Sequence, residues 1–262
     1  MIDAGGVLLH VAESGPADGP ALVFCNSLGT DLRLWDKVLG LLPEGLRVIR
    51  FDKRGHGLSE LPGTGWGMGD LVADTAALLD ALGVKDSLFV GLSIGGMIAQ
   101  GLAAERPDLV RAMVLSNTGA KIGTPEMWAE RVAACRAQGI EALADAVMTR
   151  WFSAAFRETR KAELAGWRNM LVRTPMEGYA RCSEAIAESD LWESTVRLRL
   201  PTLAIAGSED GSTPPDLVRE TGELVPGSRF ALVQGAGHLP CVEAPEVFAG
   251  HLRAFVSETG HI

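Results

Sequence analysis

Short apolar segments alternate with helical patterns along most of this chain, and this alternation limits the possible folds more than any other feature. Several segments are apolar almost without interruption, as strands are when helices cover both faces of a parallel sheet. We expect an α/β fold with a doubly wound, mainly parallel sheet. The predicted strands are residues 7–11, 21–25, 47–51, 87–92, 112–115, 202–206 and 230–233; the first, flanked by glycines, is expected at an antiparallel edge.

The alternation stops between about residues 121 and 196, where no strand-like segment of comparable strength occurs. Helical patterns fill this part instead, at residues 126–138, 140–152, 160–173 and 177–187. Open α/β sheets bind ligands beyond the carboxyl ends of their strands, and an insertion at this point of the chain would lie there. The sequence therefore predicts a core of residues 1–120 and 197–262 and a helical cap, or lid, of residues 121–196, inserted before the last two strands.

Residues 91–95 read Gly-Leu-Ser-Ile-Gly, between an apolar segment and a helix-like one. This is the G-x-S-x-G pattern of a nucleophile elbow, which is specific only when a strand precedes it and a helix follows. The sharp turn forces its central residue into strained backbone angles, and small flanking residues give it room. We expect Ser93 to be a nucleophile rather than an ordinary turn serine.

A serine hydroxyl needs a histidine base, and the histidine needs a carboxylate. Asp210 and His238 each follow a predicted strand in a glycine-containing loop, so both are expected near Ser93. Glu209 adjoins Asp210 and is the alternative carboxylate. His56 is the alternative base, although a structural or pocket-lining role fits its place before Ser93 better.

Acyl transfer also needs N–H groups that bind the negatively charged oxygen. We expect one to be the backbone N–H of Ile94, the residue after the nucleophile. The other is expected in the loop after residues 21–25, where the N–H of Leu28 is the candidate.

Charge and composition exclude several classes of partner. Lys and Arg number 24 against 33 Asp and Glu, a net charge of −9, which disfavours nucleic acids and anionic membranes. We expect a cytoplasmic protein, because neither a leader segment nor a bilayer-spanning apolar run is recognisable. The four cysteines and five histidines lack metal-binding spacing, so we predict no metal, no disulfide and no cofactor. The oligomeric state is not predicted.

Over essentially its full length the chain resembles α/β-hydrolases, and within them the 3-oxoadipate enol-lactonases. The wider resemblance rests on Ser93, Asp210 and His238, on Asp-Lys-Arg-Gly-His-Gly at 52–57, and on Gly-His-Leu-Pro-Cys-Val-Glu-Ala-Pro at 237–245. The narrower one rests on residues 26–36, where Asn-Ser replaces the His-Gly of other relatives, and on matches at 117–123, 128, 131, 150–152, 174–179, 182 and 213–215.

This resemblance implies the α/β-hydrolase fold and an enzyme that opens a small anionic lactone, 3-oxoadipate enol-lactone, in the β-ketoadipate pathway of aromatic catabolism. The lactone carboxylate needs a cation, and Arg131 is expected to bind it, with Trp128 on the same face of a cap helix. A solvated cap arginine is the plain alternative, and Arg150 is the second candidate. Gly119, Lys121 and Gly211 depart from the family pattern without touching the expected catalytic side chains.

Other functions stay open at this point. The same serine, aspartate and histidine would serve another esterase, a carbon–carbon bond hydrolase or a perhydrolase. A noncatalytic ligand-binding homologue could also retain them.

Overall fold

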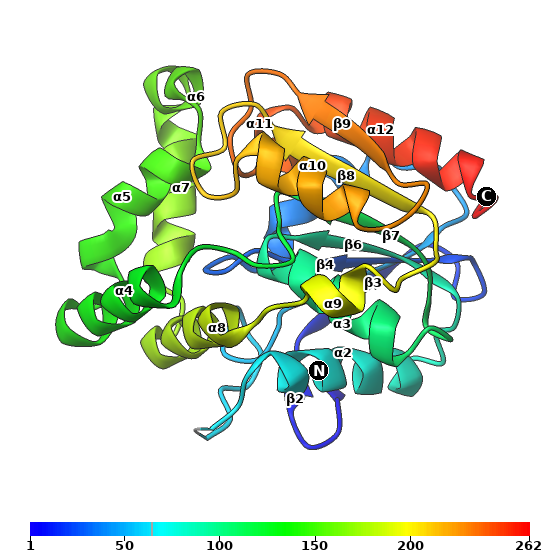
Figure 1. The fold of residues 1–262 in the computed structure, drawn as a ribbon, viewed down its shortest axis with the longest axis horizontal. Coiled ribbons are helices and arrows are strands. Elements are labelled where there is room, and N and C mark those ends of the chain that lie inside the picture. The colour runs from blue at the N-terminus through cyan, green and yellow to red at the C-terminus, as the bar shows by residue number, and fades with distance from the viewer. Residues whose placement is uncertain (64) are drawn as a thin grey trace.

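A seven-stranded sheet forms the centre of the computed structural model, which describes residues 1–63 and 65–262 (Figure 1). The strand order is β3-β5-β4-β6-β7-β8-β9; only β3 is antiparallel to its neighbour. This confirms the predicted doubly wound α/β fold. The bounds are β3 (Val11–Ser14), β4 (Ala21–Cys25), β5 (Arg47–Phe51), β6 (Ser87–Leu92), β7 (Val110–Ser116), β8 (Thr202–Gly207) and β9 (Arg229–Val233).

The expected first strand, residues 7–11, is wrong in its bounds. The chain instead forms a small separate hairpin, β1 (Ile2–Asp3) with β2 (Leu8–Leu9), and then enters the main sheet as β3, at the predicted antiparallel edge. Gly5 and Gly6 take positive φ angles of 71° and 99° at the hairpin turn. The break falls at His10, whose backbone N–H donates to Ser59 Oγ instead of to a strand.

Helices pack on both sides of the sheet and bury its central strands (Figure 1). Every residue of β4, β6 and β8 is buried, which accounts for their nearly continuous apolar sequence. Around the sheet lie η1 (Leu32–Trp35), α1 (Asp36–Leu39), α2 (Met68–Ala81), α3 (Ile94–Glu105), α10 (Pro215–Glu223), α11 (Pro240–Glu243) and α12 (Pro245–Glu258). None of the helices in the described part of the chain is long and apolar enough to cross a membrane.

Between β7 and β8 the described chain is helical, as predicted, with α6 and α9 in addition. The helices are α4 (Pro125–Gln138), α5 (Glu141–Trp151), α6 (Ala154–Thr159), α7 (Lys161–Val172), α8 (Met176–Glu188) and α9 (Trp192–Thr195). At the start of α4, Thr124 Oγ1 accepts the N–H of Met127, and Pro125 takes the first helical position. Figure 1 shows α4 to α8 beyond the carboxyl ends of the sheet strands.

Candidate active site

Ser93 lies at the sharp turn between β6 and α3, in the strained conformation that the sequence predicts. Its φ and ψ are 58° and −119°, a region that non-glycine residues rarely adopt. A Cβ atom on Gly91 would lie 2.1 Å from the Gly95 carbonyl oxygen, and one on Gly95 would lie 2.3 Å from that of Cys25. Both positions therefore require glycine. The Ser93 side chain is held at the carboxyl end of the sheet, with the residue 8% exposed.

Asp210 and His238 lie side by side at the ends of β8 and β9. The Nδ1 atom of His238 is 2.8 Å from Oδ2 of Asp210, and both side chains are buried. Asn117 Nδ2 and the Thr213 hydroxyl also donate to Oδ2, at 2.8 and 2.7 Å. The backbone N–H groups of Ser212 and Thr213 donate to Oδ1. This carboxylate is therefore fixed in orientation and faces one ring nitrogen of His238.

Two opposing effects act on the pKa of Asp210. Burial raises it, but the nearby His238 and the hydrogen bonds from His238, Asn117 and Thr213 outweigh burial, and the pKa lies below its ordinary value. Asp210 is thus an ionised partner for the imidazole, which suits the orienting role expected of it.

Neither alternative residue takes these positions. The Glu209 residue is exposed, and its carboxylate accepts a hydrogen bond of 3.4 Å from the Ala154 N–H. His56 is fully buried, and its Nε2 accepts the N–H of Gly29 at 3.0 Å. Burial, together with the positive charge of Lys53, holds the pKa of His56 well below its ordinary value. His56 therefore supports a loop as a neutral acceptor and does not line the Ser93 cavity.

A cavity of about 210 Å³ brings most of the predicted site residues together. Ser93, His238, Leu28, Trp128 and Arg131 all line it, and so does Arg150. Asp210 and Ile94 are not among the lining residues. Asp210 contacts His238, and Ile94 directly follows Ser93 in the chain. Ser93 and His238 are not hydrogen-bonded to each other within the described residues; such bonds are often long before a substrate binds. Larger hollows of about 410 Å³ beside His10 and about 710 Å³ beside Ala129 contain neither residue.

The two N–H groups expected to bind a negative oxygen are both free. Across residues 1–63 and 65–262, neither the N–H of Leu28 nor that of Ile94 donates a hydrogen bond. Ser27 also lines the cavity, and its buried Oγ likewise has no hydrogen-bond partner among the described residues. Unmatched buried donors are costly unless a ligand uses them, so this side of the cavity is suited to an electron-rich group.

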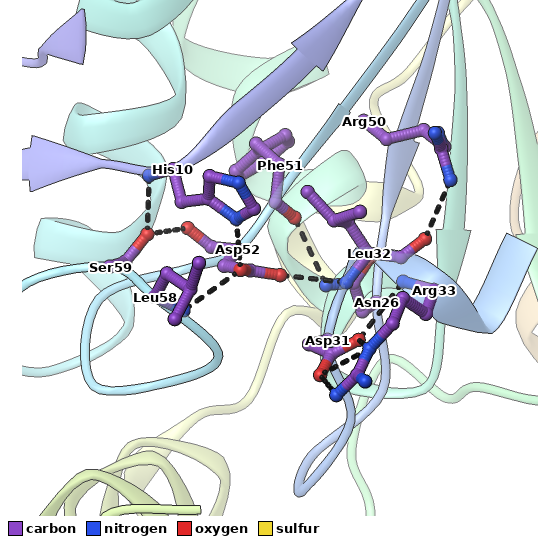
Figure 2. A network of polar contacts seen from close by, with 10 residues as sticks. All are labelled: His10, Asn26, Asp31, Leu32, Arg33, Arg50, Phe51, Asp52, Leu58 and Ser59. Atoms are coloured by element: carbon purple, nitrogen blue, oxygen red, sulfur yellow. Dashed lines mark hydrogen bonds and ion pairs between the residues drawn. The ribbon is translucent and has the colours of Figure 1, made fainter. Parts of the chain in front are cut away.

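The loop that carries Leu28 is fixed by a polar network at its two ends (Figure 2). Asn26 Nδ2 donates to the Phe51 carbonyl oxygen at 3.0 Å, and Asn26 Oδ1 accepts the indole N–H of Trp35. Further along, Asp52 Oδ1 accepts the N–H of Leu32 at 2.7 Å, while its Oδ2 contacts His10 Nδ1 at 2.8 Å. Asn26, at the family-specific start of this loop, thus has a structural role.

Two arginines from the helical segment, Arg131 and Arg150, line the cavity and have no acidic partner among the described residues. The Arg131 guanidinium lies over the Trp128 ring, with its carbon 4.5 Å from the ring centroid. Burial, and then the charge of Arg131, lowers the pKa of Arg150. No described Asp or Glu forms an ion pair with either. In a protein of net charge −9, such a pair is suited to an anionic ligand.

Tyr179 on α8 is a site residue that the sequence reasoning missed. It is buried, lines the cavity and is the only tyrosine in the chain, which was an available signal. Burial raises the pKa of its hydroxyl, and the neighbouring charges of Arg131 and Arg150 oppose that rise. Its neutral hydroxyl is therefore a further polar group on the arginine side of the cavity.

The loop of His238 is attached to the helical segment by a second missed residue, Glu243. Its Oε1 accepts the N–H of Gly237 at 2.7 Å, and its Oε2 accepts the hydroxyl of Ser153 at 2.5 Å. The residues 237–245 matched the family pattern, but nothing in that pattern indicated this contact. Asn117, which donates to Asp210, was missed in the same way.

The described residues contain no group of three or more His, Cys, Asp or Glu side chains that could hold a metal ion.

A family model described as the alpha/beta hydrolase fold matches residues 20–139. The chain is 36% identical to "3-oxoadipate enol-lactonase 2" of Acinetobacter baylyi, over 94% of this chain and 92% of that protein. It is 34% identical to "3-oxoadipate enol-lactonase 1" of the same organism, over 96% and 94%. The crystal structure of the enol-lactonase from Burkholderia xenovorans LB400 is similar, with a TM-score of 0.94 and 36% identity over 97% of this chain and 98% of that one.

Proposed function

The chain belongs to the α/β-hydrolase family, and we propose that it hydrolyses 3-oxoadipate enol-lactone to 3-oxoadipate with Ser93 as nucleophile. This lactone is a five-membered ring with one ester carbonyl and one carboxylate. The observation that carries the proposal is that one cavity meets both needs: Ser93 and His238 line it together with two arginines that lack an acidic partner. The names of the enol-lactonases to which the chain is similar support this substrate.

In the first half of the reaction the ring opens. Ser93 Oγ attacks the carbonyl carbon while His238 Nε2 accepts the hydroxyl proton, and Asp210 stabilises the resulting imidazolium through Nδ1. The N–H groups of Leu28 and Ile94 bind the oxygen that becomes negatively charged. The ring C–O bond then breaks, the departing enolate oxygen takes the proton from His238, and the acyl chain stays on Ser93.

In the second half water removes the acyl chain. His238 accepts a proton from the water as it attacks the ester carbonyl carbon, and returns that proton to Ser93 Oγ. The enol product tautomerises to 3-oxoadipate. An enolate is a good leaving group, so ring opening needs modest assistance and deacylation is the step expected to limit turnover.

The arginines are proposed to orient the lactone by its carboxylate. Arg131, held over Trp128, is the first candidate, and Arg150 lies close enough for its pKa to respond to the charge of Arg131. Residues 121–196 are proposed to act as the cap that carries these groups and closes the cavity over the strand ends. The enzyme is placed in the β-ketoadipate pathway and in the cytoplasm as part of the same proposal.

A substrate comparison tests this function. The wild-type protein should open the enol-lactone with a kcat/KM far above that for p-nitrophenyl acetate, a neutral ester without a carboxylate. A fluorophosphonate probe should label the wild type and not Ser93→Ala. Efficient ester hydrolysis without lactone opening would instead favour a general esterase, and failure to label would contradict the serine mechanism.

A further inference from the structure

Lys53 is a buried cation that the mechanism above does not use. The residue is 2% exposed, and its Nζ donates to the Ser27 carbonyl oxygen at 2.7 Å and, more weakly, to that of Asn26 at 3.4 Å. No carboxylate among the described residues lies within ion-pair distance of it. Burial of an ammonium group without an acidic partner is unfavourable, so a compensating role is expected for Lys53.

No acidic group in the described part of the chain forms an ion pair with Lys53, and burial lowers its pKa from the ordinary value of a lysine. Burial raises the pKa of Cys25 and of Cys182 to about 12, so both nearby thiols are uncharged at neutral pH. The nearest acidic residue along the chain, Asp52, is occupied by the N–H of Leu32 and by His10 (Figure 2). The positive charge is therefore directed at the backbone of the loop that borders the cavity.

The contacted carbonyl has a particular place in that loop. The oxygen of Ser27 and the N–H of Leu28 belong to one planar peptide group, in which resonance couples the two ends. A cation that binds the oxygen draws electron density from the nitrogen and makes the N–H a stronger donor, as in other chains of polarised hydrogen bonds. The Leu28 N–H is the free donor expected to bind the negative oxygen.

We propose that Lys53 is a positioning residue that polarises and fixes the Ser27–Leu28 peptide, so that the Leu28 N–H binds the negative oxygen of the transition state more strongly. The proposal rests on the serine mechanism proposed above. Lys53 acts together with His56, whose neutral Nε2 accepts the N–H of Gly29 and holds the next peptide of the loop. His56 sets geometry, whereas Lys53 adds charge.

The expected effect falls on the transition state and not on substrate binding. The lactone carbonyl oxygen carries little charge in the bound substrate and a full negative charge in the tetrahedral intermediate, so a stronger donor stabilises mainly the latter. Loss of a whole oxyanion donor lowers kcat by about 10²- to 10³-fold, and loss of its polarisation should cost less, about 10- to 100-fold.

The test compares Lys53→Met, which removes the charge, with Lys53→Arg, which keeps it, and with Lys37→Met, a matched change at a partly exposed lysine that pairs with Glu163. Two ligands distinguish stabilisation of the tetrahedral intermediate from binding of the uncharged ground state. An alkyl boronic acid forms a tetrahedral anion on Ser93, whereas adipate resembles the product and does not react. Lys53→Met should lower both the affinity for the boronic acid and kcat/KM by the same factor, about 10- to 100-fold. KM and the affinity for adipate should stay within about twofold of the wild-type values. Lys53→Arg should recover most of the loss, and Lys37→Met should show none.

Two further variants exclude a structural effect. Trp35→Phe removes a neutral hydrogen bond to Asn26 in the same loop and leaves the charge in place. If Trp35→Phe lowers the affinity for the boronic acid as much as Lys53→Met does, the role of Lys53 is merely structural and the proposal is wrong. Lys53→Gln keeps an N–H donor but removes the charge, and it replaces Lys53→Met if Lys53→Met does not fold. A wild-type kcat/KM in Lys53→Gln would overturn the proposal. Binding of the boronic acid requires Ser93 and the two N–H groups but not recognition of the lactone, so a wild type that binds it without opening the lactone contradicts the proposed substrate alone.

Discussion

The backbone N–H of His238 donates a hydrogen bond of 2.8 Å to the carbonyl oxygen of Trp151, the last residue of α5. The approach is close: a Cβ on Gly237 would lie 2.5 Å from that same oxygen. Glu243 joins the two segments a second time, through Gly237 and Ser153. The histidine loop of the core and the helices above it are thus one connected unit, and the position of the base depends on both.

Removal of the Glu243 carboxylate should disturb this unit. We expect Glu243→Ala to lower kcat/KM about 10-fold and the free energy of unfolding by about 1–3 kcal/mol, because the N–H of Gly237 and both the N–H and the hydroxyl of Ser153 lose their acceptor. Steady-state kinetics and urea titration measure both. Glu209→Ala is the matched control, since that exposed carboxylate makes only a 3.4 Å contact with Ala154; similar losses in both variants would contradict a specific role for Glu243.

The arginine pair should govern binding of the lactone carboxylate. Arg131→Ala is expected to raise KM for the enol-lactone about 10- to 100-fold, the value of a charge-assisted hydrogen bond, and to change KM for neutral p-nitrophenyl acetate little. Arg136→Ala, on the same helix but paired with Glu177 and Glu184, serves as control. If KM is unchanged in Arg131→Ala but raised in Arg150→Ala, then Arg150 and not Arg131 binds the lactone carboxylate.

The lowered pKa of Asp210 predicts how stability depends on pH. An acid whose pKa is lower in the folded state stabilises the fold fully above its unfolded pKa, about 3.9 for Asp, and this contribution is lost as pH falls through the folded value. The urea midpoint of the wild type should therefore exceed that of Asp210→Asn near neutral pH, and the difference should shrink below about pH 4. A difference that stays constant with pH would show that the carboxylate charge is not the cause.

The elbow glycines should be indispensable. Gly91→Ala places a Cβ 2.1 Å from the Gly95 oxygen. We expect a loss of about 1–3 kcal/mol in stability and of most activity, measured by thermal unfolding and by turnover. Gly69→Ala, at a helical position with no atom within 4 Å, should be neutral or stabilising by up to about 1 kcal/mol. Full activity in Gly91→Ala would refute the account of the elbow.

The features that the sequence predicts well are those that local patterns specify. Residues 91–95 carry their own turn geometry, and β8 and β9 place Asp210 and His238 at one edge of a parallel sheet because such strands end together. Most strands of the sheet could also be predicted from the sequence, because strands buried on both faces are almost entirely apolar.

The features that escaped prediction depend on contacts between distant segments. Glu243 meets Ser153 ninety positions earlier in the chain, and Asn117 meets Asp210 ninety-three positions later. In the sequence, Lys53 is only one member of a common loop pattern. Its hydrogen bond to the carbonyl oxygen of Ser27 is apparent only in the structure. The helical period placed Arg131 beside Trp128, but only packing brings Arg150 and Tyr179 to the same cavity.

The central claim is tested most directly by spectrophotometric loss of enzymatically generated 3-oxoadipate enol-lactone, with the wild type and Ser93→Ala assayed at equal concentration. We predict rapid loss with the wild type and a kcat lower by about 10⁴-fold or more in Ser93→Ala, as for removal of other serine nucleophiles. Circular dichroism of both proteins verifies that the variant is folded. No turnover by the wild type, or equal turnover by a folded Ser93→Ala, would contradict the claim.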